Sequence, residues 1–458
     1  LFSYELLREN GRPNHRTFYA KVANATIVDE RTIRFEIGPE IDREMPLILG
    51  LMPILSEAAT DLETFSDGGL TPLLGSGPYT IADVDPGASI TYQRNPDYWA
   101  DGLSVVRGTN NFAEIRYDYY RDGNTMLEAF KRGLYDIRPE DNPTRWATQF
   151  DFPAVRNGEI LREELDVGVP RGMTALVFNT RRPIFSDPRV RRALIELFDF
   201  AWLNRTLYHE LYARTASFYE ASELSARGRP ADAREQELLA PWLDYVKPDV
   251  MDGSFTLPET DGSGRDRAGL RRATALLNEA GYRAVDGRLV SDETGEPVEI
   301  EFLAATPEQE RLALAYRQLL ERVGIALDVR LVDSAQYQRR QTDYDFDIVQ
   351  NHWFASLSPG NEQLFYWGSD AARTEGTRNY PGIENPAVDA MIEAMLAAHT
   401  REDFVAAVRA LDRVLISGDY VIPLFHLPRQ WVAHTARVSR PETTSLFGYI
   451  SETWWETP

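Results

Sequence analysis

Segment 351–367, which reads NHWFASLSPGNEQLFYW, holds the densest group of side chains suited to recognising a ligand. It follows directly on a predicted strand. Trp353 and Phe354 offer broad apolar faces, and the segment's amide and hydroxyl groups offer directional hydrogen bonds. Such a mixture can desolvate a polar ligand and still satisfy its polar groups. From the residues alone, the aromatics could equally be core residues, with turn formers around Pro359 and Gly360.

A second candidate group follows a predicted strand that ends at Phe178. Asn179 and Arg181 come just after it, at the kind of strand end where open α/β sheets bind ligands. Arg181 or Arg378 could form a bidentate pair with a ligand carboxylate. The alternative is that these arginines are solvated surface groups, because nearly all of the 49 basic residues are arginines.

Sequence signatures of catalysis and of metal binding are absent. The 6 histidines show neither H-x-x-x-H nor H-E-x-x-H spacing and cysteine is missing, so we expect no metal site and no cofactor. The sequence has neither a G-x-S-x-G elbow nor a G-x-x-x-x-G-K-[ST] loop. Because a pair of cleft carboxylates leaves no motif, a secreted hydrolase acting on peptides or glycans stays open as the alternative function.

Composition narrows the range of partners. The formal net charge of −22 argues against nucleic acid and anionic membrane surfaces, both of which need a basic face. No stretch reaches the roughly 18 consecutive apolar residues that predict a membrane-spanning helix. The length of 458 residues suggests more than one domain, and 43% hydrophobic residues suffice for their cores.

Residues 178–208, FNTRRPIFSDPRVRRALIELFDFAWLNRTLY, carry the most informative local pattern. Asp187 is a natural N-cap, and Pro188 suits the first position of a helix. Val190 and Leu194 recur at helical spacing and begin one apolar face. The arginines of this helix, at 189, 191 and 192, are expected on its solvent side.

This string resembles a motif of the family 5 solute-binding proteins of ABC importers, in which a strand precedes a P-x-F-x-D-x-R-V-R-x-A-L helix. GSGPY at 75–79 and NPDYW at 95–99 resemble two further strings of that family and stand in the expected order. The pattern of residues 142–155 resembles the YejA-like peptide-binding branch.

The resemblance implies an α/β protein with a type II, cluster C-like periplasmic-binding-protein fold, in which two lobes of mixed sheets flanked by helices are joined by a hinge. We expect 1–172 to form lobe one, 173–430 to form lobe two with a surface insertion at about 214–265, and 431–458 to return to lobe one. The opening helix resembles one that lies well inside lobe one. We therefore expect an N-terminal part of lobe one to be missing, or to be supplied by a separate segment.

The resemblance also implies a function. The protein would be a periplasmic, non-enzymatic component of an ABC importer that captures a peptide or peptide-like solute between its lobes. It would deliver this ligand to the permease in the inner membrane.

In peptide-binding relatives an aspartate grips the ligand's α-ammonium group, and the matching position here is the neutral Ser356. An amine could instead be held by Glu362, Glu140 or Asp141. The stretch 179–181 is expected to face the Trp353 segment across the cleft. The predicted ligand-binding residues are Trp353, Phe354, Ser356, Ser358, Asn361, Tyr366, Trp367, Asn179, Arg181, Arg378, Asn379, Glu140 and Asn142.

Overall fold

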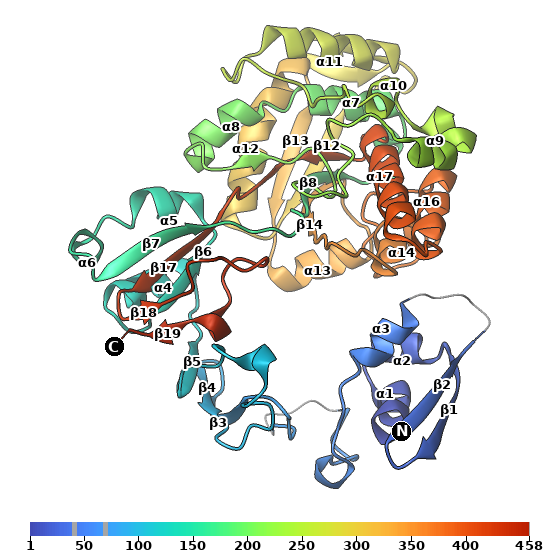
Figure 1. Cartoon of the computed structure of the whole chain (residues 1–458). Coiled ribbons are helices and arrows are strands. Elements are labelled where there is room, and N and C mark those ends of the chain that lie inside the picture. The colour runs from blue at the N-terminus through green and yellow to red at the C-terminus, as the bar shows by residue number, and fades with distance from the viewer. Residues whose placement is uncertain (39–43, 67–71, 458) are drawn as a thin grey trace. The chain divides into compact units, whose positions relative to one another are not determined.

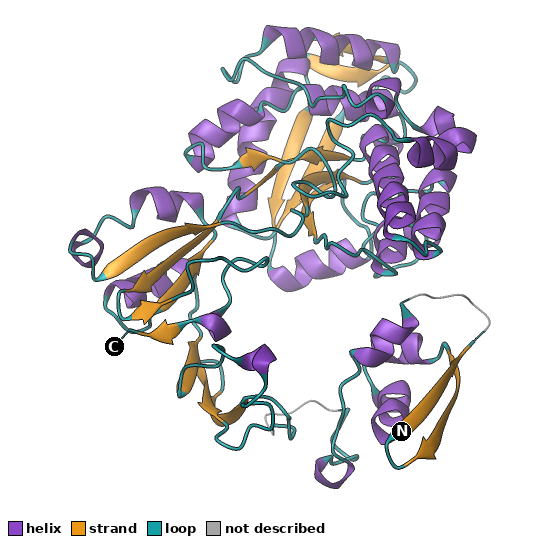
Figure 2. Ribbon diagram, viewed as in Figure 1, coloured by secondary structure: helices purple, strands orange, loops and turns teal. Residues whose placement is uncertain are grey.

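The computed structural model describes residues 1–38, 44–66 and 72–457, and Figures 1 and 2 show its helices and strands. The chain divides into two compact units. Unit 1 comprises Leu1–Glu140, Phe150–Leu165 and Gln430–Pro458. Unit 2 comprises Asp141–Gln149 and Asp166–Arg429. Segments 141–149 and 166–172, which the sequence analysis assigned to lobe one, therefore belong to unit 2. One reason is that the helix in 141–149 packs against a helix of unit 2.

Unit 2 is built on a five-stranded mixed sheet with the strand order β13-β12-β14-β8-β15. Strand β12 is parallel to both β13 and β14, whereas β8 is antiparallel to β14 and β15. Nearly every residue of β8 is buried, as expected for a central strand with both faces covered. The strands are β8 (Met173–Phe178), β12 (Glu299–Ala304), β13 (Ala326–Leu331), β14 (Ile348–Trp353) and β15 (Val421–Pro423).

Two hydrophobic cores cover the two faces of this sheet. Leu176 and Phe178 of β8 point into one core, and Ala175 and Val177 point into the other, because successive strand residues face opposite sides. The first core packs α7 (Pro188–Glu196), α8 (Phe200–Tyr208), α11 (Arg267–Glu279) and α12 (Pro307–Leu320). The second packs α14 (Glu362–Trp367), α16 (Pro386–Leu396) and α17 (Arg401–Ser417).

The smaller elements of unit 2 connect these layers. They are α5 (Pro143–Thr148), β9 (Ala213–Arg214), α9 (Ala233–Leu239), α10 (Pro248–Met251), β10 (Tyr282–Val285), β11 (Arg288–Ser291), α13 (Ser334–Thr342), α15 (Ser369–Ala372) and β16 (Phe425–His426), with 3-10 helices at Pro183–Phe185, Ala240–Tyr245 and Glu321–Val323.

The helix predicted after Asp187 is confirmed as α7. The Asp187 carboxylate accepts a hydrogen bond from the backbone N–H of Arg189, as an N-cap does. The expectation that all three arginines face solvent is wrong for Arg191, which is buried. Its guanidinium donates to the carbonyls of Phe185 and Asp419, so it ties α7 to the loop before β15.

Segment 214–265 is not the surface insertion expected from the sequence. Phe218, Leu224 and Leu239 belong to the second core. Asp412 of α17, which is fully buried, accepts hydrogen bonds from the Ser217 hydroxyl and from the N–H of Phe218. The polar composition of the segment concealed these anchors, because its loops satisfy their polar groups against α17 rather than against water.

Unit 1 contains small sheets in place of one large one. Their orders are β1-β2, β3-β4-β5, β6-β17-β7 and β18-β19. The elements are α1 (Phe2–Asn10), α2 (Pro13–Tyr19), β1 (Val22–Asp29), β2 (Thr32–Ile37), α3 (Met45–Gly50), β3 (Tyr79–Asp85), β4 (Ser89–Arg94), β5 (Glu114–Asp118), α4 (Gly123–Lys131), β6 (Ile137–Glu140), α6 (Pro153–Arg156), β7 (Ile160–Leu165), β17 (Gln430–Thr435), β18 (Val438–Ser439) and β19 (Trp455–Glu456), with 3-10 helices at Glu57–Ala59, Ser104–Val106 and Ser451–Thr453.

A buried ion pair generates a stability prediction for unit 2. Arg413 of α17 pairs with Glu235 of α9 at 2.6 Å, with both side chains essentially inaccessible, and it also donates to the carbonyls of Val250 and Arg229. Arg413→Met leaves the buried Glu235 carboxylate with only the longer contact to Arg409 at 3.8 Å, so we expect the free energy of unfolding to fall by about 3–5 kcal/mol. Urea denaturation measures it.

The matched control is Arg234→Met, which removes exposed pairs with Glu237 at 2.6 Å and with Asp403 at 3.0 Å. An exposed pair contributes about 0–1 kcal/mol, so this variant should unfold like the parent. Equal loss of stability in the two variants would contradict the anchoring role of Arg413.

Candidate functional site

The carboxyl ends of β12, β13 and β14 lie at one edge of the unit 2 sheet, because these three strands are parallel. Strand β8 starts at the same edge, where its first residue, Met173, pairs with Trp353 at the end of β14. In open α/β sheets, ligands bind outside the carboxyl ends of the strands. We call this region the carboxyl edge.

A cavity of about 300 Å³ lies at the carboxyl edge. Gln350 of β14, together with Thr306 and Gln309 at the start of α12, provides amide and hydroxyl groups. The aromatic walls are Tyr208, Tyr212 and Phe425, and the other lining residues are Asp141, Asn142, Pro143, Arg145, Glu308 and Arg311. A cavity with aromatic walls, amides and charges of both signs can hold a compact polar ligand.

The aromatic walls hold one another in place. The Tyr212 and Phe425 rings are stacked, with centroids 4.1 Å apart and an angle of 11° between their planes. Tyr208 packs against Phe425 at 4.8 Å, and burial raises the pKa of the Tyr208 phenol well above its usual value. The Tyr212 hydroxyl donates to the carbonyl of Asp141 at 3.3 Å, which ties the start of α5 to these rings. Walls fixed in this way need little ordering when a ligand binds.

Two capped helix starts supply the polar part of the lining. The Thr306 hydroxyl accepts from the N–H of Gln309 at 3.2 Å, and the Gln309 amide oxygen accepts from the N–H of Ala305 at 2.8 Å. This arrangement is close to a capping box, except that Gln309 bonds to the residue before the N-cap. Asn142 caps α5 by accepting from the N–H of Arg145 at 3.0 Å. Thr306 and Asn142 line the cavity, and their role as N-caps explains why both are small polar residues.

His352 continues the same strand beyond Gln350 and lies on the same face of the sheet. Its Nδ1 lies 2.9 Å from the Thr174 hydroxyl, and its ring meets Phe354 edge to face at 4.5 Å. Desolvation lowers the pKa of His352, so the ring is a neutral hydrogen-bonding group at pH 7. A Cβ on Gly172 would come within 2.1 Å of the Trp353 carbonyl oxygen, so only glycine fits where β8 begins.

The loop after β14 presents side chains to solvent next to His352. Phe354 is 71% exposed, and Ser356 and Ser358 are also exposed. The Ser356 hydroxyl accepts from the N–H of Ser358 at 3.2 Å and so shapes the turn. The Glu362 carboxylate accepts from the N–H of Gly360 at 3.0 Å.

Other predicted residues of the 351–367 segment lie deeper. Trp353 and Trp367 are each 2% exposed, with ring centroids 4.7 Å apart, inside the second core. The Trp353 indole donates to the Arg378 carbonyl at 3.1 Å. Asn361 is buried, whereas Tyr366 is half-buried beneath the exposed Arg378, whose guanidinium carbon lies 6.0 Å from its ring centre. The structure thus gives both indoles a packing role.

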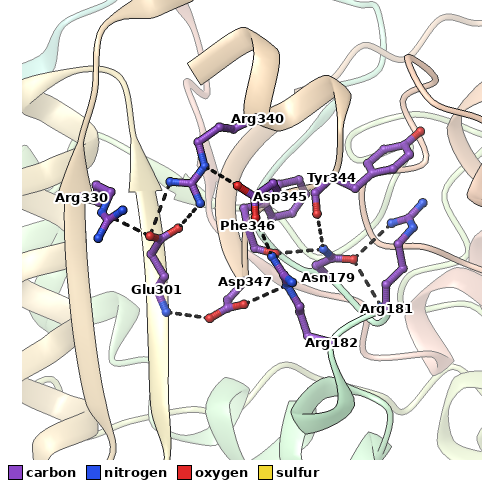
Figure 3. A network of polar contacts seen from close by, with 10 residues as sticks. All are labelled: Asn179, Arg181, Arg182, Glu301, Arg330, Arg340, Tyr344, Asp345, Phe346 and Asp347. Atoms are coloured by element: carbon purple, nitrogen blue, oxygen red, sulfur yellow. Dashed lines mark hydrogen bonds and ion pairs between the residues drawn. The ribbon is translucent and has the colours of Figure 1, made fainter. Parts of the chain in front are cut away.

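Asn179 and Arg181 lie at the opposite edge of the sheet. Figure 3 shows the polar contacts of both residues there. The amide of Asn179 donates to the carbonyls of Tyr344 and Phe346 at 2.9 Å each. The expectation that 179–181 faces the Trp353 segment is wrong. Because β8 and β14 are antiparallel, Phe178 pairs with Ile348 at the far end of β14 from Trp353.

Arg181 holds together the loops at that opposite edge. Its guanidinium donates to the carbonyls of Ala372, Asn379 and Tyr380 at 2.6–3.2 Å. Its guanidinium carbon also lies 3.8 Å from the centre of the Tyr344 ring. These contacts use the donors that a ligand carboxylate would need.

Two further predicted residues have structural partners, and a third reaches the cavity. The Asn379 amide donates to the Gly368 and Ile383 carbonyls, and its side chain is inaccessible. Glu140 of unit 1 pairs with Arg138 at 2.7 Å, and both side chains are buried. Asn142, in contrast, lines the cavity at the carboxyl edge.

Sequence reasoning missed the aromatic walls and Gln350. Tyr208 and Tyr212 have the i, i+4 spacing of one helix face, which by itself indicates packing. Phe425 is more than 200 positions away in sequence, and only the β9–β16 pairing brings it beside them. Gln350 lies in the middle of β14, and a search for polar side chains within a predicted buried strand would have found it.

The part of the chain that the structure describes contains neither a cluster of metal-binding side chains nor a helix that could span a membrane. Residues 1–38, 44–66 and 72–457 contain no group of three His, Asp or Glu side chains placed to hold a metal ion. Within the same ranges, no helix has the length and apolar character needed to cross a membrane.

Solved structures share this architecture. The oligopeptide-binding protein AppA from Bacillus subtilis, in complex with a nonapeptide, matches with a TM-score of 0.69. The match covers 100% of this chain and 82% of that chain at 16% identity. It confirms the type II periplasmic-binding-protein fold expected from the sequence, and so defines the class of fold.

Sequence comparisons specify the family. Residues 1–375 match the model of the bacterial extracellular solute-binding proteins, family 5. A binding protein of Brucella suis biovar 1 (strain 1330) is 50% identical over 458 residues, which is 100% of this chain and 74% of that protein. In Agrobacterium fabrum, the peptidoglycan-binding protein YepA is 41% identical (100% of this chain, 75% of YepA), and the probable peptide-binding protein YejA is 39% identical (99% and 75%).

The chain belongs to the family 5 bacterial extracellular solute-binding proteins, in their YejA-like branch. Its role is that of the substrate-binding component of an ABC importer, as expected from the sequence. The alternative of a secreted hydrolase finds no support in the family or in the fold.

The contrast between neighbouring aromatics gives a test of the site geometry. Trp353→Ala removes a buried indole and should lower the free energy of unfolding by about 3–5 kcal/mol. Phe354→Ala removes an exposed ring and should change it by less than about 0.5 kcal/mol. Thermal and urea unfolding of the two variants provide the comparison. Similar losses in both would show that Phe354 packs in the core.

Proposed function

We propose that the carboxyl-edge cavity and the loop beside it bind a peptide-like solute, and that the peptide portion of a peptidoglycan fragment is the first candidate. The observation that carries this proposal is the cavity lining, which combines stacked aromatic rings with amide groups and charges of both signs. A peptide backbone presents carbonyls and N–H groups that amides satisfy, and its side chains can pack on the rings.

The lack of an acidic side chain at Ser356 supports an unconventional peptide. Ser356 is a short neutral hydroxyl engaged with the N–H of Ser358. It cannot neutralise a free α-ammonium group as an aspartate does. A ligand whose charges are distributed along its length suits Asp141, Glu308, Arg145 and Arg311 better.

The names of relatives point in the same direction. YepA is named a peptidoglycan-binding protein, YejA a probable peptide-binding protein, and AppA was solved with a nonapeptide. These names describe those proteins. For this chain they define the panel of ligands to test first.

We assign direct contact to the exposed or cavity-lining members of the predicted set. These are Phe354, Ser356, Ser358 and Asn142, joined by Tyr208, Tyr212, Gln350, His352 and Phe425. Tyr366 and Arg378 remain candidates at the surface of the following loops. Trp353, Asn361, Trp367, Asn179, Arg181, Asn379 and Glu140 would act by holding the site or the fold in shape.

Binding would use no covalent step. The ligand would favour one conformation of the protein, which a permease in the inner membrane would recognise. The compartment we propose is the periplasm, in keeping with the extracellular designation of the family.

Calorimetry with defined ligands tests this function. The panel is a peptidoglycan stem tripeptide, an all-L tripeptide with a free N-terminus and the same tripeptide with an acetylated N-terminus. We expect the stem tripeptide to bind at one per chain and to be recovered intact by mass spectrometry. Turnover of the bound peptide, or a lack of binding by all three, would contradict the proposal.

Tyr212 provides the site-specific prediction. Tyr212→Ala removes one wall and the tie to Asp141, so the Kd of the bound peptide should rise at least about tenfold, the size of a typical hot-spot loss. Tyr245→Ala, at an exposed tyrosine of the 3-10 helix Ala240–Tyr245, is the matched control and should leave Kd unchanged. Unchanged affinity in a folded Tyr212→Ala variant would remove the cavity from the binding site.

A further inference from the structure

A second cavity of unit 2 lies beside the carboxyl edge and has no role in the site described so far. Its volume is about 560 Å³, and its lining comes from segment 220–229, Gly168 and Leu357. Leu357 belongs to the loop after β14, which carries several of the proposed ligand contacts. The N–H of Arg171, two residues before β8, donates to the Glu220 carbonyl at 2.8 Å. We call this cavity the side pocket.

Few residues separate the side pocket from the carboxyl-edge cavity. Phe425 lines that cavity, and Nδ1 of the next residue, His426, lies 3.0 Å from the Thr215 hydroxyl. The N–H of the residue that follows, Ala216, donates to the Glu220 carboxylate at 2.8 Å. A ligand that extends from the cavity along the loop after β14 can therefore reach the side pocket.

The walls of the side pocket are held in place by α17. The buried Asp412 carboxylate accepts hydrogen bonds of 2.7–2.9 Å from both ends of segment 217–226. Arg401 of the same helix donates to the Leu357 carbonyl at 3.1 Å and pairs with Glu223, so it joins the two walls. A pocket fixed in this way needs little ordering when a ligand binds.

Both carboxylates of the side pocket already have partners, whereas one of its cations does not. Glu220 pairs with Arg227 at 3.0 Å, and Glu223 pairs with Arg401. The remaining charged residue of the lining is Arg229, which is exposed. Within the part of the chain that the structure describes, Arg229 has no ion-pair partner, and its guanidinium donates only to the Glu223 carbonyl, at 3.5 Å. The local balance of charge is therefore positive, in a chain whose net charge is −22.

The surplus of arginines also affects Glu223, whose pKa lies below its ordinary value. The first cause is the hydrogen bond from Arg401, and the positive charges of Arg409 and Arg229 lower the pKa further. Since Arg401 already pairs with Glu223, the guanidinium of Arg229 is available to a carboxylate from outside the chain. A guanidinium can hold such a group through two parallel N–H bonds.

We propose that the side pocket is a second subsite, which binds a carboxylate of the same ligand with Arg229 as its charged partner. This inference rests on the proposed function, because the ligand must also occupy the carboxyl edge. It narrows the ligand class to peptide-like solutes that carry an acidic group beyond the portion held in the carboxyl-edge cavity. Arg227, whose side chain is 52% exposed, has further N–H donors for the same group.

Two matched pairs of peptides test the subsite by calorimetry on the 458-residue chain. In the first pair, the N-terminus of the peptidoglycan stem tripeptide carries an acetyl or a succinyl group. In the second pair, its C-terminus is extended by a glutamine amide or a glutamate amide. In one of these pairs the acidic member should bind at least about fivefold tighter than the neutral member, because hydrogen bonds between charged groups are stronger than neutral ones.

Three variants connect this gain in affinity to Arg229. Arg229→Gln removes the guanidinium but keeps the backbone carbonyl to which Arg413 donates, so it should fold like the parent. It should lose the gain and leave the Kd of the neutral peptide unchanged. Arg229→Lys keeps the charge without the planar fork and should retain part of the gain. The matched control is Arg265→Gln, which removes an exposed arginine outside the side pocket and should retain the whole gain.

Two results would overturn the inference alone. One is equal affinity of the acidic and neutral members in both pairs, when the neutral members bind. The other is a gain that Arg229→Gln retains, or that Arg265→Gln abolishes as well. If no peptide of the panel binds, the proposed function fails and this inference fails with it, so the two failures are distinguishable.

Discussion

The antiparallel insertion of β8 between β14 and β15 is the constraint on which the rest of unit 2 depends. Pairing of Met173 with Trp353 fixes which side chains meet at the carboxyl edge, and pairing of Phe178 with Ile348 sends Asn179 and Arg181 to the other. A shift of one residue in this register would exchange the two cores of the sheet, because successive residues of β8 belong to different cores. Both cores are large and apolar, so the register is strongly specified.

Local patterns in the sequence were sufficient to predict helices and their N-caps. Asp187 and Thr306 cap the helices predicted after them, and the fold class followed from motifs that stand in order along the chain. These features depend on residues close together in sequence. The composition of segment 351–367 likewise marked a region that does border the carboxyl edge, although its members divide between surface and core.

What the sequence could not provide was the pairing of distant segments. The sequence does not distinguish an aromatic residue that faces a ligand from one that packs in a core. Trp353 and Phe354 are neighbours, yet Trp353 is buried and Phe354 is exposed. An arginine is ambiguous in the same way. Arg181, Arg191 and Arg413 are engaged with backbone carbonyls or buried carboxylates, which only the folded chain brings within reach. In a chain with 49 basic residues, most of them arginines, composition alone gives no sign of these buried contacts.

The two units differ in the size of their sheets and in how far packed elements cover them. In unit 2 the central strands of the main sheet have helices or loops packed on both faces, and buried polar groups such as Asp412 and Asn379 are satisfied by named partners. Unit 1 divides its strands among sheets of two and three, and two of its end strands line a common cavity. Short sheets bury less apolar surface per strand and leave more unpaired backbone, and an open edge is costly unless something covers it. The larger cavity therefore lies in unit 1, where end strands β5 and β6 contribute to its lining, whereas the candidate cavity of unit 2 is smaller and is walled by aromatic rings that pack on one another.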